Sequence, residues 1–181
     1  MASPIAHAVV ALTIGRFWPS SAWPLHLWLL GVVCAEVPDL DTVGFWLGVP
    51  YGHLLGHRGV THPILFAVLF SWVVARLVSG TGDNHCHRQL WGYFVLATLS
   101  HGFLDALTDG GLGVAFFSPF DQTRYFFPIR PIIVTPLELS LVLGPVGAAV
   151  LVSEVVWIWL PCTLILGGHW WTSRLRAAPA D

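Results

Sequence analysis

Long apolar segments alternate with short polar ones along most of this chain. Residues 62–79 contain a single charged side chain, Arg76, and residues 139–168 contain only Glu154. Because about 20 mostly apolar residues in a helix cross roughly 30 Å of hydrocarbon, each segment predicts a membrane-spanning helix. Three shorter or more polar segments would complete a bundle: residues 4–17, 24–35 and 89–107. The pattern therefore predicts an all-α integral membrane bundle of about five helices.

The composition supports a membrane protein. Of the 181 residues, 55% are hydrophobic and 10% are charged, and the net charge of −2 gives no reason to expect a nucleic-acid partner. The three cysteines lie far apart and form no C-x-x-C pair, so neither a disulfide framework nor a thiolate zinc site is expected. No basic stretch precedes the first apolar segment, which argues against a cleaved secretory signal. We expect one membrane-embedded domain over residues 1–176 and a loose tail over residues 177–181.

The few acidic residues are concentrated in two short motifs, "PDLD" at 38–41 and "SHGFLDALTDGG" at 100–111. An acid at the bilayer centre costs roughly 2.5–3.5 kcal/mol, so acids and histidines in membrane segments are functional candidates. Asp39 and Asp41 follow a helix-stopping proline and could equally be ordinary turn residues. His101 and Asp105 are four residues apart, which places both on one helical face at the spacing that can hold a metal ion.

The order of the helices brings these polar residues together. If successive helices alternate in direction, the candidate residues fall at one membrane face, whereas unrelated helix caps would divide about equally between the two faces. The candidate metal ligands are His7, Asp39, Asp41, His57, His62, His101, Asp105 and Glu138. Because the set has many donors and no thiolate, it predicts two or more ions of zinc or another divalent metal.

A metal cluster at a membrane face favours hydrolysis. A bound divalent ion lowers the pKa of water to roughly 7 and so supplies metal-bound hydroxide at neutral pH. Asp39 and Asp105 could bridge the ions and are catalytic candidates. Arg58, in the motif "HRGVTHP" at 57–63, could clamp a phosphate through two hydrogen bonds and is a third catalytic candidate. The alternative for Arg58 is an arginine that reaches for lipid head groups.

The order of the motifs also suggests a family. His7, "PDLD", "HRGVTHP", "SHGFLDALTDGG" and the aromatic "FSPF", between residues 7 and 128, resemble the bacterial membrane-bound metal-dependent hydrolases, also described as LexA-regulated inner-membrane hydrolases. That family is distantly similar to the all-α zinc-dependent phospholipase C and single-strand nuclease superfamily, whose His-x-x-x-Asp pair matches His101 and Asp105. The resemblance implies a phosphoester substrate such as a phospholipid. It also implies that five residues bind or support metal: Asp39, His57, His62, His101 and Asp105.

Two other functions compete with hydrolysis. A metal-ion transporter, or a non-catalytic metal-binding membrane protein, could use the same ligands, but transport requires a polar path to the other face. A haem protein would leave the paired acids unexplained. The loop "FFSPFDQTRYFFPIRPI" at 116–132 is either a lid or lipid-binding surface, or an interfacial aromatic belt.

The arginines suggest an orientation in the bacterial inner membrane. Three arginines lie on the predicted site face: Arg58, Arg124 and Arg130. Five lie on the opposite face: Arg16, Arg76, Arg88, Arg174 and Arg176. Because positive residues favour the cytoplasmic side, we expect the site on the non-cytoplasmic face.

Overall fold

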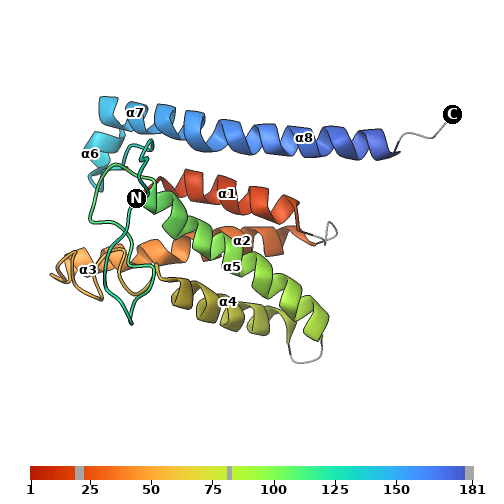
Figure 1. Cartoon of the computed structure of the whole chain (residues 1–181), viewed down its shortest axis with the longest axis horizontal. Helices are drawn as coiled ribbons and strands as arrows, with labels where there is room; N and C mark the ends of the chain where they lie inside the picture. The colour runs from red at the N-terminus through yellow and green to blue at the C-terminus, as the bar shows by residue number, and fades with distance from the viewer. Residues whose placement is uncertain (19–22, 81–82, 178–181) are drawn as a thin grey trace.

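The computed structural model describes residues 1–18, 23–80 and 83–177, and within these ranges it contains helices and two isolated β-bridges but no strand. The predicted all-α class is confirmed (Figure 1). In chain order the elements are α1 (Pro4–Arg16), α2 (Leu25–Glu36), the 3₁₀ segment η1 (Val37–Thr42), α3 (Val43–Trp46), α4 (Ile64–Ser79), α5 (Asn84–Ala106), α6 (Leu139–Val142), α7 (Pro145–Glu154), the π-helical segment η2 (Val155–Trp159) and α8 (Leu160–Ala177).

Local signals set the helix ends. The side chain of Ser3 accepts a hydrogen bond from the Ala6 N–H and caps α1, whose first residue is a proline. Asp83 accepts hydrogen bonds from the N–H groups of His85 and Cys86, the second and third residues of α5, so this helix begins five residues before the predicted residue 89. Helix α4 starts after Pro63 and ends at Gly80, whose φ of 65° suits glycine.

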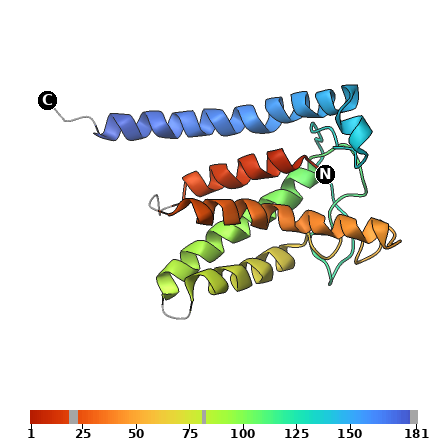
Figure 2. The same ribbon diagram turned by 180° about the vertical axis from the view of Figure 1, so that it is seen from behind.

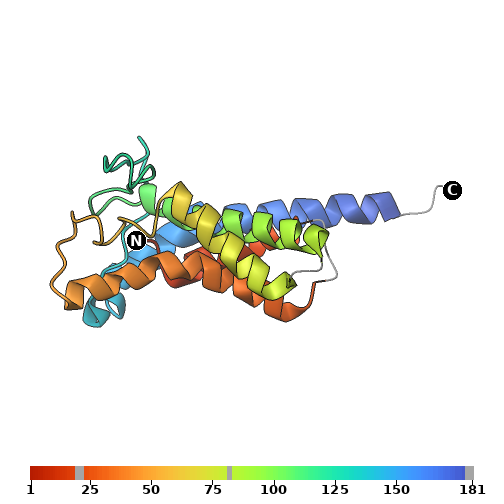
Figure 3. The ribbon, with the colours of Figure 1, turned by 90° about the horizontal axis from the view of Figure 1, so that it is seen from below.

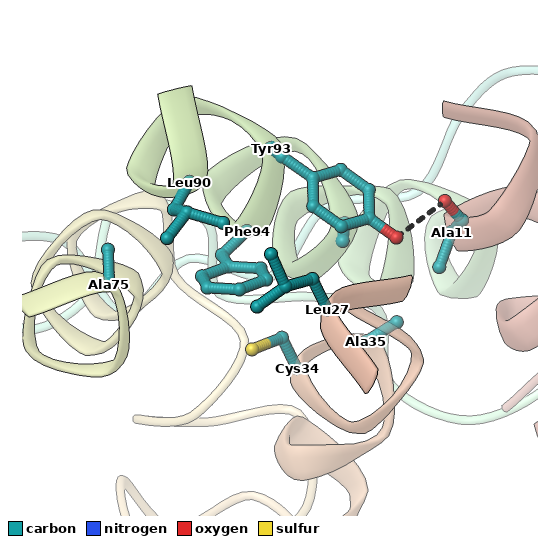
Figure 4. Packing of buried hydrophobic residues seen from close by; sticks show 9 residues of the cluster. Ala11, Leu27, Cys34, Ala35, Ala75, Leu90, Tyr93 and Phe94 are labelled. Atoms are coloured by element: carbon teal, nitrogen blue, oxygen red, sulfur yellow. Dashed lines mark hydrogen bonds between the residues drawn. The ribbon is translucent and has the colours of Figure 1, made fainter. Parts of the chain in front are cut away.

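Helices α1, α2, α4 and α5 form a bundle in which α5 contacts the other three. Tyr93 and Phe94 of α5 are fully buried and pack between small side chains of the neighbouring helices, such as Ala11, Cys34 and Ala75 (Figure 4). Small residues let the helices approach closely, which is how helices commonly pack in membranes. Tyr93 donates its hydroxyl to the Ala11 carbonyl at 3.3 Å and so satisfies its one polar group.

One helix among the described residues is long and apolar enough to cross a membrane, residues Pro145–Arg176, in which an 18-residue stretch has a mean hydropathy of 2.0. It lies beside α1, which it contacts, and extends past the bundle (Figures 1 and 2). The predicted span at 139–168 therefore starts later, because Gly144 and Pro145 interrupt it, and it ends later, at Ala177. Of the predicted tail, Ala177 belongs to α8 and residues 178–181 lie outside the described residues.

The other predicted span, residues 62–79, is too long. Because His62 and Pro63 lie outside the helix, α4 has 16 residues and rises about 24 Å, which falls short of the roughly 30 Å of a bilayer core. Helix α1, with 13 residues, is shorter still. The loops that follow α3 and α5 gather at the end of the bundle that holds the N-terminus (Figure 3). This is the end where the candidate residues lie.

Candidate metal centre

Four candidate ligands converge from three separate segments. Asp39 belongs to η1, His62 to the loop before α4, and His101 and Asp105 to consecutive turns of α5. One ligand atom from each lies within 4.8 Å of the other three. The Nε2 atoms of His62 and His101 are 3.1 Å apart, and Nε2 of His101 lies 3.3 Å from Oδ1 of Asp39. Oδ2 of Asp105 completes the group, 3.7 Å from His62 Nε2 and 3.9 Å from His101 Nε2.

This arrangement fits a divalent cation. Ligands at about 2.0–2.2 Å from a tetrahedral zinc ion lie roughly 3.3–3.6 Å from one another, close to the separations found here. The Asp39 side chain is only 11% exposed, yet neither of its oxygens has a hydrogen-bond partner among the described residues. Burying a carboxylate without a partner is costly, so its surroundings favour a bound cation. The neighbouring His101 ring keeps the pKa of Asp39 below its usual value, although burial acts in the opposite direction.

Both histidines are oriented by their second ring nitrogen. Nδ1 of His101 lies 2.7 Å from the Ala35 carbonyl at the end of α2, so with Nδ1 protonated the Nε2 lone pair faces the centre. Nδ1 of His62 lies 3.2 Å from Oδ2 of Asp41 and 3.0 Å from the Thr61 hydroxyl. A carbonyl or carboxylate behind the ring is the usual support of a metal-binding histidine.

Asp41 is the hub of a second group with His57 and His62. Its Oδ1 lies 2.7 Å from Nδ1 of His57, and its Oδ2 accepts hydrogen bonds from the Arg58 N–H at 3.0 Å and the Thr61 hydroxyl at 2.6 Å. Although burial opposes it, these histidine contacts hold the pKa of Asp41 well below its usual range. Burial likewise disfavours a charged His62, but its contacts with Asp105 and Asp41 raise its pKa to about 9. Asp41 therefore orients the two histidines, with which it also forms a group that could hold a metal ion.

Arg58 does not have the geometry of the predicted phosphate clamp. Its side chain is fully buried, and Nε donates to Oδ2 of Asp105 at 2.7 Å. The two remaining nitrogens donate to the Gly110 carbonyl and the Thr108 hydroxyl. The residue also adopts a positive φ of 62°, which is uncommon for a residue other than glycine. With its nitrogens engaged inside the protein, Arg58 positions Asp105 instead of meeting a substrate.

The remaining candidates divide into one neighbour of the centre and one distant residue. The ring of His7 stacks on His101 with centroids 3.8 Å apart, and its Nε2 lies 3.9 Å from Oδ1 of Asp105. Neither His7 nitrogen has a hydrogen-bond partner among the described residues. Glu138 directly precedes the short helix α6, is exposed and accepts a hydrogen bond from Ser140. The structure does not bring Glu138 to the cluster.

The residues that hold the N-terminal segment beside the centre were not predicted from the sequence. The Ala2 N–H donates to Oδ1 of Asp105 at 2.9 Å. Both the N–H and the hydroxyl of Ser3 donate to the fully buried Glu154 at 2.6 Å, and Ser153 accepts the Ile133 N–H. A single acid in a 30-residue apolar segment was the signal for Glu154. Its neighbour in space, Ser3, carried no comparable signal.

The aromatic loop at 116–132 lies against the site. Arg124 donates to the carbonyls of His57 and Tyr51, which ties the loop to the "HRGVTHP" segment. Phe116 accepts the Ile64 N–H at the start of α4. Beside it lies an apolar pocket of about 330 Å³, lined by Ile64, Phe103, Phe116, Phe117, Tyr125, Phe126 and Phe127. The loop thus braces the two histidines of the motif while its aromatic rings form an outer surface.

Comparison with known proteins agrees with a membrane location. The profile of the family described as YdjM inner membrane protein matches residues 1–175. The chain is 38% identical over 177 residues to the inner membrane protein YbcI of Escherichia coli strain K12, covering 96% of this chain and all of that protein. No solved structure matches. With a family profile matched over almost its whole length, this chain belongs to the YdjM inner membrane protein family.

Proposed function

We propose that this protein is an integral-membrane, metal-dependent hydrolase that acts on a phosphoester, with zinc as the best-matched metal. The observation that carries the proposal is the buried Asp39 carboxylate without a hydrogen-bond partner among the described residues, facing two oriented histidine nitrogens. A mixed set of imidazole and carboxylate donors without thiolate suits zinc and similar divalent ions. The resemblance of the motif order to metal-dependent membrane hydrolases supports the same reaction class.

The geometry favours one principal ion over the predicted two or more. Asp39, His62, His101 and Asp105 would hold it, with His7 as an additional nitrogen donor nearby. The second group shares His62, and its Asp41 is already bonded to His57, Arg58 and Thr61. A bound ion supplies Lewis acidity and activates water at neutral pH. The sharing of His62 links the two groups through one ring.

The protein's own residues would keep such a centre in order. Arg58 and the Ala2 N–H each fix one oxygen of Asp105, so this carboxylate has a single orientation. The Ala35 carbonyl fixes the His101 ring in the same way. Fixing the ligands before the substrate arrives removes reorganisation from the reaction, which is a main source of catalysis. Asp39 is the most exposed of the four side chains, at 11%, although both of its oxygens are buried.

Metal transport is the weaker alternative. A transporter needs polar groups that continue from the site to the other face. Beyond His101, the interior between α1, α2 and α5 is instead filled by Leu27, Leu90, Tyr93 and Phe94, all buried (Figure 4). The hydroxyls of Tyr93 and Thr98, which are buried there, donate to backbone carbonyls. This apolar core favours a site that works at one face.

The decisive experiment measures metal content and hydrolysis together. Detergent-purified protein is loaded with zinc or manganese and offered an aryl phosphodiester, an aryl phosphomonoester and a phospholipid. We expect stoichiometric zinc and hydrolysis of at least one substrate, both lost in His101→Ala and kept in His53→Ala, because His53 is an exposed histidine outside the cluster. Zinc bound without turnover of any substrate would leave a non-catalytic metal-binding protein. Absence of bound zinc would refute the centre.

A further inference from the structure

A polar pocket lies between the end of α4 and the start of α5, at the end of the bundle opposite to the metal centre. It measures about 510 Å³ and is lined by Trp72, Arg76, Asn84, His87, Arg88 and Trp91. The lining follows helical periodicity, since the α4 residues are four apart and the α5 residues follow an i, i+3, i+4, i+7 pattern. One face of each helix therefore meets in the pocket. None of the candidate metal ligands takes part.

The pocket is cationic. Arg76 and Arg88 supply two guanidinium groups, and no acid is among its lining residues. The nearest acid in sequence, Asp83, uses Oδ1 to accept the His85 and Cys86 N–H groups as the cap of α5. The lining residues of α5 also belong to its first two turns, where the helix dipole favours an anion. An anionic ligand is therefore the complement of this pocket.

The polar side chains are held in place. His87 is 5% exposed, its Nδ1 lies 3.4 Å from the Ser79 hydroxyl, and its ring meets the edge of Trp72. The Arg76 guanidinium lies over the Trp72 ring, 5.8 Å from its centroid. Trp91 donates its indole N–H to the Val68 carbonyl, which fixes the back wall. The ring of His87 makes no other hydrogen bond with the described residues, so it can serve a ligand.

The setting of the pocket identifies the source of the anion. Arg16, Arg174 and Arg176 end α1 and α8 at this same end of the molecule, away from the metal centre (Figure 1). Arginine and tryptophan at the ends of membrane helices are typical of the head-group level. Basic pockets between membrane helices bind the head groups of anionic lipids. We propose that this pocket binds the phosphate of an anionic phospholipid head group, with Arg76 and Arg88 as the charged contacts and Trp72 and Trp91 beside the glycerol and upper acyl region.

Native mass spectrometry of the full chain in detergent tests the proposal, with phosphatidylglycerol and phosphatidylcholine of identical acyl chains as probes. We expect one retained phosphatidylglycerol that phosphatidylcholine does not replace. Arg76→Gln and Arg88→Gln should each weaken binding by about tenfold or more, since each removes a charge-assisted hydrogen bond to the phosphate. Arg174→Gln is the matched control, because its guanidinium also lies over a tryptophan, 5.1 Å from the centroid of Trp170, but outside the pocket. It should bind like the parent.

Three outcomes would overturn the proposal. Equal retention of the two lipids would show that charge is not recognised. If Arg174→Gln loses as much phosphatidylglycerol binding as the Arg76 and Arg88 variants, the lipid is attracted by the basic surface in general and not by the pocket. Inorganic phosphate that competes as well as phosphatidylglycerol would show an anion site that does not take a lipid. Circular dichroism of each variant separates these outcomes from misfolding, and none depends on metal or on hydrolysis.

Discussion

Asp39 and Asp41 lie two residues apart in the same 3₁₀ segment, yet their surroundings are opposite. Both oxygens of Asp41 are bonded, to His57, to Arg58 and to Thr61. Neither oxygen of Asp39 has a hydrogen-bond partner among the described residues, although His101 lies close to it. A carboxylate with full partners stabilises the fold, whereas a buried one without them is costly unless a cation joins it. The comparison separates the supporting region from the binding region.

The largest effect is expected at Asp39. Asp39→Asn should lower zinc affinity by more than about 100-fold, because losing even an outer support of a metal ligand costs 10–100-fold. The metal-free protein should keep its thermal unfolding temperature, since neither oxygen of Asp39 makes a hydrogen bond with the described residues. Metal content by mass spectrometry and unfolding scans in detergent measure the two properties. If Asp39→Asn keeps its zinc, Asp39 is not a ligand. If the metal-free variant unfolds at a lower temperature, Asp39 supports the fold as Asp41 does.

At Asp41 a substitution should lower the stability of the metal-free protein and have a smaller effect on zinc affinity. Asp41→Ala should destabilise the metal-free protein by about 3 kcal/mol, because it leaves the partners of a buried charge unsatisfied. Zinc affinity should fall by roughly 10–100-fold through loosened histidines, less than for Asp39→Asn. Chemical unfolding and chelator competition check both numbers. If stability is unchanged, Asp41 is not the support that its hydrogen bonds indicate.

Proton competition at His62 provides a third test. Its pKa is raised from 6.5 to about 9, so the charged ring stabilises the metal-free protein fully below pH 6.5 and this contribution is lost as pH rises through about 9. Zinc needs the neutral ring, so its affinity should rise by up to tenfold per pH unit from 7 to 9 and then level off. Chelator competition across this range measures the slope. A flat profile would exclude His62 as a ligand.

The smallest effect is expected at Glu138. Glu138→Gln should leave zinc content, unfolding temperature and hydrolysis unchanged, because the exposed side chain contacts Ser140 and not the cluster. It is the reference against which the Asp39 and Asp41 variants are judged. A loss of zinc in Glu138→Gln would place a ligand outside the two groups.

Helical spacing and helix order were enough to predict that the candidate ligands lie together. The separation of four between His101 and Asp105 placed them on one face of α5, and alternation of the helices brought Asp39 and His62 to the same end. The difference between Asp39 and Asp41 could not be predicted, because it depends on which loop side chains point at each carboxylate. The buried partners of Arg58 could not be predicted either, because Asp105, Thr108 and Gly110 lie about 50 residues away in sequence.

The unequal helix lengths have a consequence for the surrounding bilayer. Helix α1 rises about 20 Å and α4 about 24 Å, whereas residues Pro145–Arg176 rise about 48 Å. Against a core of roughly 30 Å, α5, which rises about 35 Å, and the long helix are in excess, while α1 and α4 fall short, which is hydrophobic mismatch within one molecule. Lipids beside α1 and α4 must compress locally. The activity of the proposed metal centre should therefore depend on the acyl-chain length of the lipid, because thinner membranes accommodate α1 and α4 at less cost.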